Sequence, residues 1–515
     1  MSLFDWIVIA LYLTGTIILG LWVSKKQENL KDFFLGGRSI PWWAALLSMV
    51  ATEISAATFL GAPEQGYIRD MTYMQFSIGT VLARFVIAAV FLGVFYRFQV
   101  YTIYGYLTHR FGAPTHTSVA GVFLLGRLFA SGARLFIASI AINVATGLDM
   151  TSSIIILAIV AIAYTWLGGI KAVIWTDVAQ AVILVGGGII TVLSLISHIP
   201  LSFSEIIDQV AEAGKFRIFD FRWTTLDGGS AALLNPYHFI PAVIGGFFLT
   251  MATHGTDHDM VQRLLTCKNS KEGKRSLWMS GFLSVMVALL FIFIGQLLFV
   301  YVTQLPTGHH MVEIADQLRA SGKNGHFFLH YIVEILPMGI TGLVLASVFA
   351  AAMSSLDSAL NAMSATVVTD FYKPYFRKNA DSKHYLKVSR LATILIGALL
   401  VGAALLVVYY YEANPETDLL SIALGVMTLF YGALLGIFLI GLLMKSRGST
   451  VSNIVGMALS IIVIILIKYN TSLAWPWFIV IGTLITFIIS FIGRTASVIV
   501  EKFELENNSN IEMNG

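Results

Sequence analysis

Two stretches of small and hydroxyl-bearing residues stand out in this apolar chain, and both could supply oxygen ligands to a hard cation. The first is ATEISAAT, residues 51–58, with four polar side chains and a glycine and a proline close behind. A helix that breaks inside a membrane frees backbone carbonyls, which bind cations where they line a cavity. The alternative is close helix packing, with Ser55 and Thr58 bonded back to their own helix. Glu53 in the same stretch favours the cation site.

The second stretch is AAAMSSLDS, residues 350–358. At about 100° per residue, Ala351, Ser354, Ser355 and Ser358 fall within one arc of roughly 100° on a helix. Three hydroxyls on a face of small residues suit a hard cation. The alternative is a packing seam of small residues between two helices.

Ionisable side chains inside membrane spans are costly, and each is a functional candidate by default. Asp177 lies about a turn and a half inside one end of the apolar run 171–197, where it could complete or release a cation site. The alternative is an interfacial acid that reaches out to water. The ionisable residues expected inside spans are Glu53, Arg84, Arg127, Arg134, Asp177 and Asp357.

The elements that must position these residues are membrane-spanning helices. Of the 515 residues 57% are hydrophobic and 12% are charged, where a soluble domain carries about 25% charged residues. The mean hydropathy is +0.80. This composition excludes a water-soluble protein, and apolar runs recur from end to end, so we expect one integral membrane domain.

We expect an all-α polytopic protein with about thirteen transmembrane helices and a single transporter-like domain over residues 1–493. Amphipathic stretches at 204–214 and 312–319 predict short surface helices, and the polar tail 494–515 is expected to be cytoplasmic and disordered. The expected spans are 4–24, 42–68, 71–96, 117–148, 150–167, 171–197, 236–256, 277–304, 338–369, 388–411, 418–444, 451–468 and 475–493.

The distribution of basic residues predicts the orientation. Of the 32 Lys and Arg residues, 22 fall in loops on one side, 7 on the other and the remaining three within spans. Basic loops face the cytoplasm, so the N-terminus is expected outside and the C-terminus inside. No Lys or Arg precedes the first apolar run, which therefore reads as a retained span. The one cysteine, Cys267, excludes a disulfide framework, and we expect a lone thiol in a polar loop.

These stretches together resemble the solute:sodium symporter family. Four motifs carry the resemblance in order: DFFLGGR at 32–38, YTWLGG at 164–169 leading to Asp177, VQR at 261–263, and residues 349–358. Within the family, the resemblance is closest to the bacterial sodium–sialic acid symporters and more distant to the sodium–galactose symporter. It implies a leucine-transporter-type fold with five-plus-five inverted repeats, at about 42–197 and 236–444, and flanking helices.

The resemblance also implies a function. It predicts sodium-coupled import of a small polar organic solute (a sugar, a sugar acid such as sialic acid, or a small carboxylate) by alternating access across the cell membrane. Sodium is the expected coupling ion and the only metal, with no organic cofactor and no catalytic residue. The expected partners are the solute, sodium and the lipid bilayer, with no nucleic acid and no obligate protein partner.

Two sodium sites follow from the resemblance. The main site corresponds to the backbone carbonyls of Ala51, Ile54 and Ala351 and the hydroxyls of Ser354 and Ser355. A second site of the sialic acid symporters corresponds to Asp177, Ser354 and Ser358, but their remaining ligand is a serine where this chain has Asp357. That change could strengthen sodium binding, favour a proton, or reflect a structural role for Asp357.

The solute-binding residues match less well. Ser55 and Thr58 agree with hydroxyls that contact sialic acid, but the family's carboxylate-binding arginine falls at Ala130. Arg127 and Arg134 share a helix face with that position; either could substitute, or either could pair with Glu53 or Asp357. Residues that bond sugar hydroxyls in the galactose symporter fall at Thr58, Ser77 and Asp257. The candidate solute site is therefore Glu53, Ser55, Thr58, Tyr73, Ser77, Arg127, Arg134 and Asp257.

Other classes of protein have weaker support. His254 and His258 have the spacing of a zinc site on a helix, but no third ligand stands out, and a polar helix end in the solute gate is favoured. An intramembrane hydrolase using Ser354 or Ser355 lacks a nearby base, and a membrane sensor is disfavoured by the short tail. A proton-coupled transporter, with Glu53 and Asp357 titrating, is the main alternative.

Overall fold

The computed structural model describes residues 1–23, 30–98, 100–165, 169–224 and 228–496, and in these residues every regular element is a helix. Helices follow from the apolar runs, because a backbone in lipid must satisfy its own hydrogen bonds. The all-α fold is as expected. Residues 497–515 of the expected tail 494–515, and residues 166–168 of the YTWLGG motif, lie outside the described residues.

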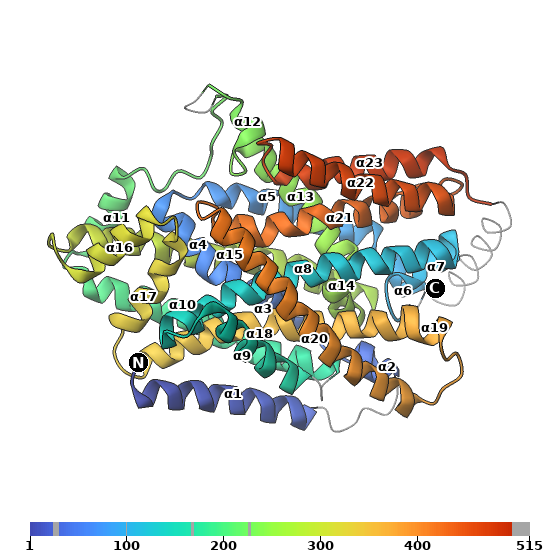
Figure 1. Ribbon diagram of the computed structural model, residues 1–515, viewed down its shortest axis with the longest axis horizontal. Coiled ribbons are helices and arrows are strands. Elements are labelled where there is room, and N and C mark those ends of the chain that lie inside the picture. The colour runs from blue at the N-terminus through green and yellow to red at the C-terminus, as the bar shows by residue number, and fades with distance from the viewer. Residues whose placement is uncertain (24–29, 99, 166–168, 225–227, 497–515) are drawn as a thin grey trace.

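Each expected apolar run coincides with a helix or a pair of helices (Figure 1). In the described residues, ten helices are long and apolar enough to cross a membrane, and a bent pair would be an eleventh; α9 and α23 are shorter. The number that cross therefore stays a prediction. The helices are α1 (Leu3–Val23), α3 (Trp42–Glu53) with α4 (Ala56–Ile68), α5 (Gln75–Val90) with α6 (Leu92–Arg97), α8 (Ala113–Thr146), α9 (Met150–Thr165), α10 (Ile170–His198), α13 (Phe239–Gly255), α15 (Ser270–Gln304), α18 (Ile340–Thr366), α20 (Ser382–Ala413), α21 (Leu419–Leu443), α22 (Thr450–Asn470) and α23 (Pro476–Ile492).

The expected break in the second apolar run is confirmed. Helix α3 ends at Glu53 and α4 begins at Ala56, with a bend of 60° between them. Ile54 leaves the helical region, with ψ at 72°, and Ser55 is extended. The backbone carbonyls near the break are therefore not all used in hydrogen bonds within the two helices.

A second broken helix corrects the seventh expected span, 236–256. The chain continues after α13 into α14 (His258–Leu265), and the link between them contains Asp257 in extended conformation. The Asp257 side chain accepts a hydrogen bond from the backbone N–H of Asp259 and caps α14. His254 and His258 thus lie on different helices, and no cluster of three metal-binding side chains occurs in the described residues.

Helix α18 lies at the centre of the bundle and α1 at its edge. The most apolar part of α18 is 94% buried, whereas that of α1 is 11% buried. Figure 1 shows α1 along one border, where it packs against α10 and α18. The hydroxyl-rich stretch of α18 therefore lies where water and lipid are both excluded.

The two expected surface helices are present as α11 (Phe203–Glu212) and α16 (His310–Ala320), and they lie at the same end of the molecule (Figure 1). A capping box formed by Ser202 and Glu205 begins α11. The expectation for Cys267 is wrong: its side chain is buried against Ile40 and Ile174 rather than free in a polar loop. The surrounding sequence is polar, but tertiary contacts cover the thiol.

Candidate functional site

The two cation-binding candidates, about 300 residues apart in sequence, touch in the folded chain. The Ser354 hydroxyl on α18 donates a hydrogen bond of 2.8 Å to the carbonyl of Ala51 on α3. The Thr52 hydroxyl donates to the Ser354 carbonyl at 3.4 Å. The broken span and the small-residue face of α18 thus form one oxygen-rich surface.

The residues predicted for the main sodium site lie around this contact and are buried. The Ser355 hydroxyl donates to the carbonyls of Ala351 and Ala352, at 3.2 and 3.0 Å. A hydroxyl that donates its proton in this way keeps lone pairs on its oxygen for a cation. Ile54 lies at the break itself. The donor set of carbonyl and hydroxyl oxygens fits a hard cation such as sodium.

Asp177, predicted for the second site, is fully buried, so it is not an interfacial acid that reaches out to water. Its Oδ2 accepts hydrogen bonds from Ser48 at 2.5 Å and from Arg263 at 3.2 Å. On α18, the Ser358 hydroxyl donates to the Ser354 carbonyl at 2.7 Å. Arg263, from the VQR motif, therefore occupies one side of the Asp177 carboxylate.

Arg263 begins a chain of buried ion pairs that leads toward the centre of the protein. It contacts Asp259 at 2.7 Å, and Asp259 also pairs with Arg127. Arg127 contacts Asp257 at 3.1 Å. A pair with Glu53 or Asp357 was one alternative for Arg127; its ion-pair partners in the described chain are instead Asp257, in the α13–α14 link, and Asp259, in the first turn of α14.

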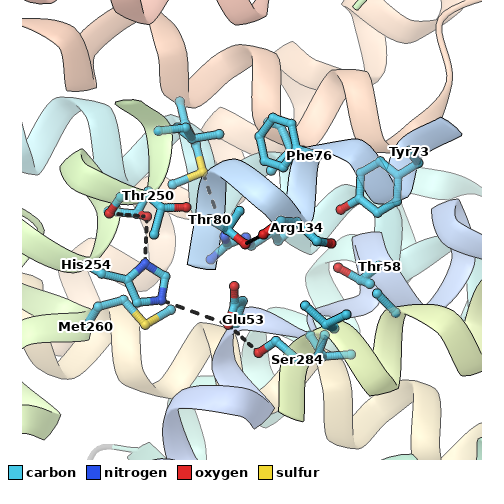
Figure 2. Close-up of a pocket in the computed structure, with 18 of the residues that line it drawn as sticks. Glu53, Thr58, Tyr73, Phe76, Thr80, Arg134, Thr250, His254, Met260 and Ser284 are labelled. Atoms are coloured by element: carbon cyan, nitrogen blue, oxygen red, sulfur yellow. Dashed lines mark hydrogen bonds and ion pairs between the residues drawn. The ribbon is translucent and has the colours of Figure 1, made fainter. Parts of the chain in front are cut away.

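A cavity of about 100 Å³ lies between the two broken helices, α5, α8, α15 and α21. Figure 2 shows several of its side chains converging on one space. Ser55 and Asp257 do not line it, because Ser55 is buried at the start of α4 and Asp257 pairs with Arg127. Of the predicted solute-binding residues, those that line the cavity are Glu53, Thr58, Tyr73, Ser77, Arg127 and Arg134.

Glu53 is the acid of the cavity, and its charge is balanced. The Arg84 guanidinium donates to both Glu53 carboxylate oxygens, at 2.6 and 2.5 Å, and Ser284 donates to one of them at 2.5 Å. Figure 2 shows His254 reaching the same carboxylate. The Glu53–Arg84 ion pair is therefore neutral overall, and these hydrogen bonds hold the Glu53 carboxylate in place in the cavity wall.

Arg134 is different, because its charge is not balanced. Its guanidinium lines the cavity and is 7% exposed. Nη2 contacts the Met427 sulfur at 3.8 Å and Nη1 has no hydrogen-bond partner in the described residues. No carboxylate of the described chain forms an ion pair with it. A buried guanidinium without an anion is costly, so this arginine faces the cavity as a ready partner for an anionic ligand.

Sequence reasoning missed part of the cavity wall. Thr80, Thr253 and Ser284 line it as single hydroxyls on apolar helices, a pattern too common to single out. The sequence marks Arg84 as a candidate because it is an ionisable residue within an expected span, but it does not indicate that Arg84 pairs with Glu53.

A cavity between two discontinuous helices, with an oxygen-rich surface at one break, is the arrangement typical of secondary active transporters. The chain belongs to the sodium:solute symporter family, whose model matches residues 33–458. The resemblance carried by the four motifs is thus confirmed. The protein is a sodium-coupled symporter of a small organic solute, which points to transport rather than enzymatic catalysis.

Known relatives cover nearly the whole chain. The sodium/sialic acid symporter SiaT of Proteus mirabilis is 30% identical over 92% of this chain and 91% of its own length. The corresponding symporter NanT of Aliivibrio fischeri is 27% identical over 95% of this chain and 92% of its own. The human sodium-coupled monocarboxylate transporter 1 is 28% identical over 89% of this chain and 72% of its own.

Solved structures support the fold. A substrate-bound, outward-open sodium-coupled sialic acid symporter superimposes with a TM-score of 0.82 at 27% identity, covering 95% of this chain and 97% of that one. Mhp1, a nucleobase-cation-symport-1 family transporter, gives 0.55 at 14% identity over 93% and 98% of the two chains, which indicates a shared fold.

Proposed function

We propose that this protein imports a small organic carboxylate together with sodium across the cell membrane, with its N-terminus outside. The observation that carries the substrate class is Arg134, a buried cation in the cavity wall with no anion in the described chain. The other charges around the cavity are already paired, Glu53 with Arg84 and Arg127 with Asp257 and Asp259. A carboxylate solute would form the missing pair.

The size of the cavity supports a solute of few carbons. Its volume of about 100 Å³ is smaller than the ~150 Å³ cavity that holds a benzene molecule in an engineered protein. Thr58, Ser77 and Thr80 in the wall can hydrogen-bond a hydroxyl or keto oxygen of the solute. A neutral sugar would leave Arg134 unpaired, and a nine-carbon sugar acid would require the cavity to widen.

We assign the main sodium site to the carbonyls of Ala51, Ile54 and Ala351 and the hydroxyls of Ser354 and Ser355. The Ser354–Ala51 hydrogen bond places two of these residues in contact. The α3–α4 break that supplies Ala51 and Ile54 also contributes to the cavity wall. Sodium that orders this break would order the solute site as well, and linkage then makes each ligand raise the affinity for the other.

Alternating access requires two halves that move around the site. The expected repeats, 42–197 and 236–444, each begin with a broken helix: α3–α4 in the first and α13–α14 in the second. Corresponding breaks in two repeats are typical of transporters whose ligands bind at the repeat interface. This symmetry supports the proposed inverted repeats.

Uptake into proteoliposomes tests the substrate class. We expect Arg134→Gln to abolish sodium-driven uptake of short monocarboxylates, and Arg134→Lys to retain a fraction, since lysine keeps the charge but not the planar fork. The matched control is Arg110→Gln, an arginine near the end of α7 (Gly105–Phe111) that bonds backbone carbonyls away from the cavity. Full carboxylate uptake by Arg134→Gln would refute the assignment, as would a preference for neutral sugars in the unaltered protein.

A further inference from the structure

A basic pocket lies at the end of the molecule opposite to the surface helices α11 and α16, where Figure 1 shows α7 and α19. Helix α18 continues through a π-helical turn, Val367–Tyr372, into α19 (Lys373–Tyr375). The cavity between α7, the start of α8 and this extension of α18 has a volume of about 560 Å³. It shares no described residue with the solute cavity, so it is a separate site.

Two lysines of this pocket have no acidic partner. Lys373 and Lys378 line the cavity and form no ion pair within the described residues. Asp370, the acid among the described lining residues, is 3% exposed and is engaged by other groups. The Thr102 hydroxyl donates to its Oδ1 at 2.8 Å, and Nε2 of His116 lies 3.2 Å from the same oxygen. The more exposed lysines therefore give the pocket positive charge that the protein does not neutralise.

Aromatic side chains lie around these lysines, and several of them are exposed. Tyr101 lines the pocket and is 44% exposed, while Tyr375 and Phe376 are 58% and 76% exposed. The Lys373 ammonium lies 5.7 Å from the ring centre of Tyr385. Aromatic residues at the end of a membrane-spanning helix typically lie at the level of the lipid headgroups. Because the extended α18 is such a helix, we expect the pocket at headgroup level on the side that the basic loops assign to the cytoplasm.

We propose that this pocket binds the headgroup phosphate of an anionic phospholipid, with Lys373 and Lys378 as its cations. Ammonium groups donate charge-assisted hydrogen bonds to phosphate oxygens, and basic pockets between helices on the cytoplasmic side suit anionic headgroups. The volume of about 560 Å³ falls within the ~300–1,000 Å³ range of small-molecule sites. A free phosphate ion would meet the same lysines, but the exposed aromatic residues favour a ligand held in the bilayer.

A headgroup bound in this pocket would hold the inner end of α18. The same helix carries Ser354 and Ser355, which we assign to the main sodium site, and it runs on to Lys373. The π-helical turn between these two regions is a rare geometry that occurs frequently at functional sites. A bound lipid should therefore stabilise the folded chain, since it contacts the folded arrangement of α7, α8 and α18 and not the unfolded chain.

A lipid titration of the purified full chain in detergent, without solute, tests the proposal. Short-chain phosphatidylglycerol should raise the melting temperature saturably, and phosphatidylcholine of the same chain length or inorganic phosphate should raise it far less. Lys373→Gln combined with Lys378→Gln should raise the half-saturating phosphatidylglycerol concentration roughly 30-fold, about 5-fold for each lysine. The matched control is Lys268→Gln combined with Lys271→Gln, two exposed lysines of the same expected side that do not line the pocket. The control should keep the original half-saturation.

Three results would overturn the site. Equal losses in the two double variants would mean general attraction of lipid to the basic face. Equal stabilisation by phosphatidylcholine would mean that the acyl chains bind and not the phosphate, and an equal effect of inorganic phosphate would mean a soluble anion instead of a headgroup. If the double variant does not fold, Lys378→Gln alone, at an exposed position, decides by its expected 5-fold change. Failure of lipid binding would leave the proposed symport standing, whereas uptake that ignores sodium would contradict the symport and not this site.

Discussion

Ser354 and Ala51 are joined by a hydrogen bond of 2.8 Å from a serine hydroxyl on α18 to a backbone carbonyl at the end of α3. The contact connects the central helix to the broken span whose residues also line the solute cavity. A cation at this contact would bind both helices at once, which is how sodium could control the shape of the cavity.

Removal of one ligand from this contact should weaken sodium binding. Ser355→Ala deletes a hydroxyl but leaves the carbonyls of Ala51, Ile54 and Ala351. Loss of one buried oxygen ligand should cost about 1–3 kcal/mol, or roughly a 5- to 150-fold rise in half-saturating sodium. Solute affinity should fall at low sodium and recover at high sodium, because coupling is reciprocal.

The control for that change lies on the same helix. Ser364 is also a buried serine of α18, but its hydroxyl pairs with Ser389 on α20. Ser364→Ala should therefore leave the sodium dependence of solute binding as it is. Equal effects of the two substitutions would mean that Ser355 acts through helix packing and not through sodium.

The two arginines on α8 should behave in opposite ways. Arg127→Gln leaves Asp257 and Asp259 without their shared cation, and breaking a buried ion pair costs about 3–5 kcal/mol, so the melting temperature should fall sharply. Arg134→Gln removes a charge with no carboxylate partner in the described chain, so stability should hold while carboxylate uptake is lost. A thermal-shift assay beside an uptake assay measures both, and a destabilised Arg134→Gln would contradict the account.

The orientation can be tested by cysteine labelling. Lys215 is a poor probe, because its ammonium is buried and donates to the carbonyls of Gly66, Tyr67 and Arg69. Arg319 and Lys378 are exposed and lie on the expected outer and inner sides. In a Cys267→Ala background, Arg319→Cys should react with an impermeant reagent from outside, and Lys378→Cys only after permeabilisation. The reverse pattern would invert the topology.

Lys215 also predicts a pH effect on stability. Burial lowers the pKa of its ammonium to about 8, whereas the unfolded chain keeps the usual pKa of about 10.4. Between these values the unfolded state binds more protons, so stability should rise with pH through that window. Lys215→Met should remove this rise in melting temperature. An identical pH profile in the variant would show that Lys215 stays charged when buried.

The sequence predicted the local features well and the long-range partners poorly. The α3–α4 break was visible because polar residues interrupt an apolar run at 51–58. The α13–α14 break was missed because Asp257 reads equally well as the polar end of a helix. The partners of Arg127 depend on how that break turns the chain, and the burial of Cys267 depends on contacts with segments far away in sequence.

Transport driven by a sodium gradient tests the central claim most directly. Proteoliposomes holding the protein, with sodium outside and choline inside, should accumulate a short monocarboxylate. An inside-negative potential of 100 mV should add roughly 50-fold to the accumulation for each net charge moved, about 2.3 kcal/mol. Uptake should disappear when choline replaces sodium outside. Robust accumulation in sodium-free buffer under a pH gradient, abolished by Asp357→Asn and indifferent to Ser355→Ala, would contradict sodium coupling and identify the proton as the driving ion.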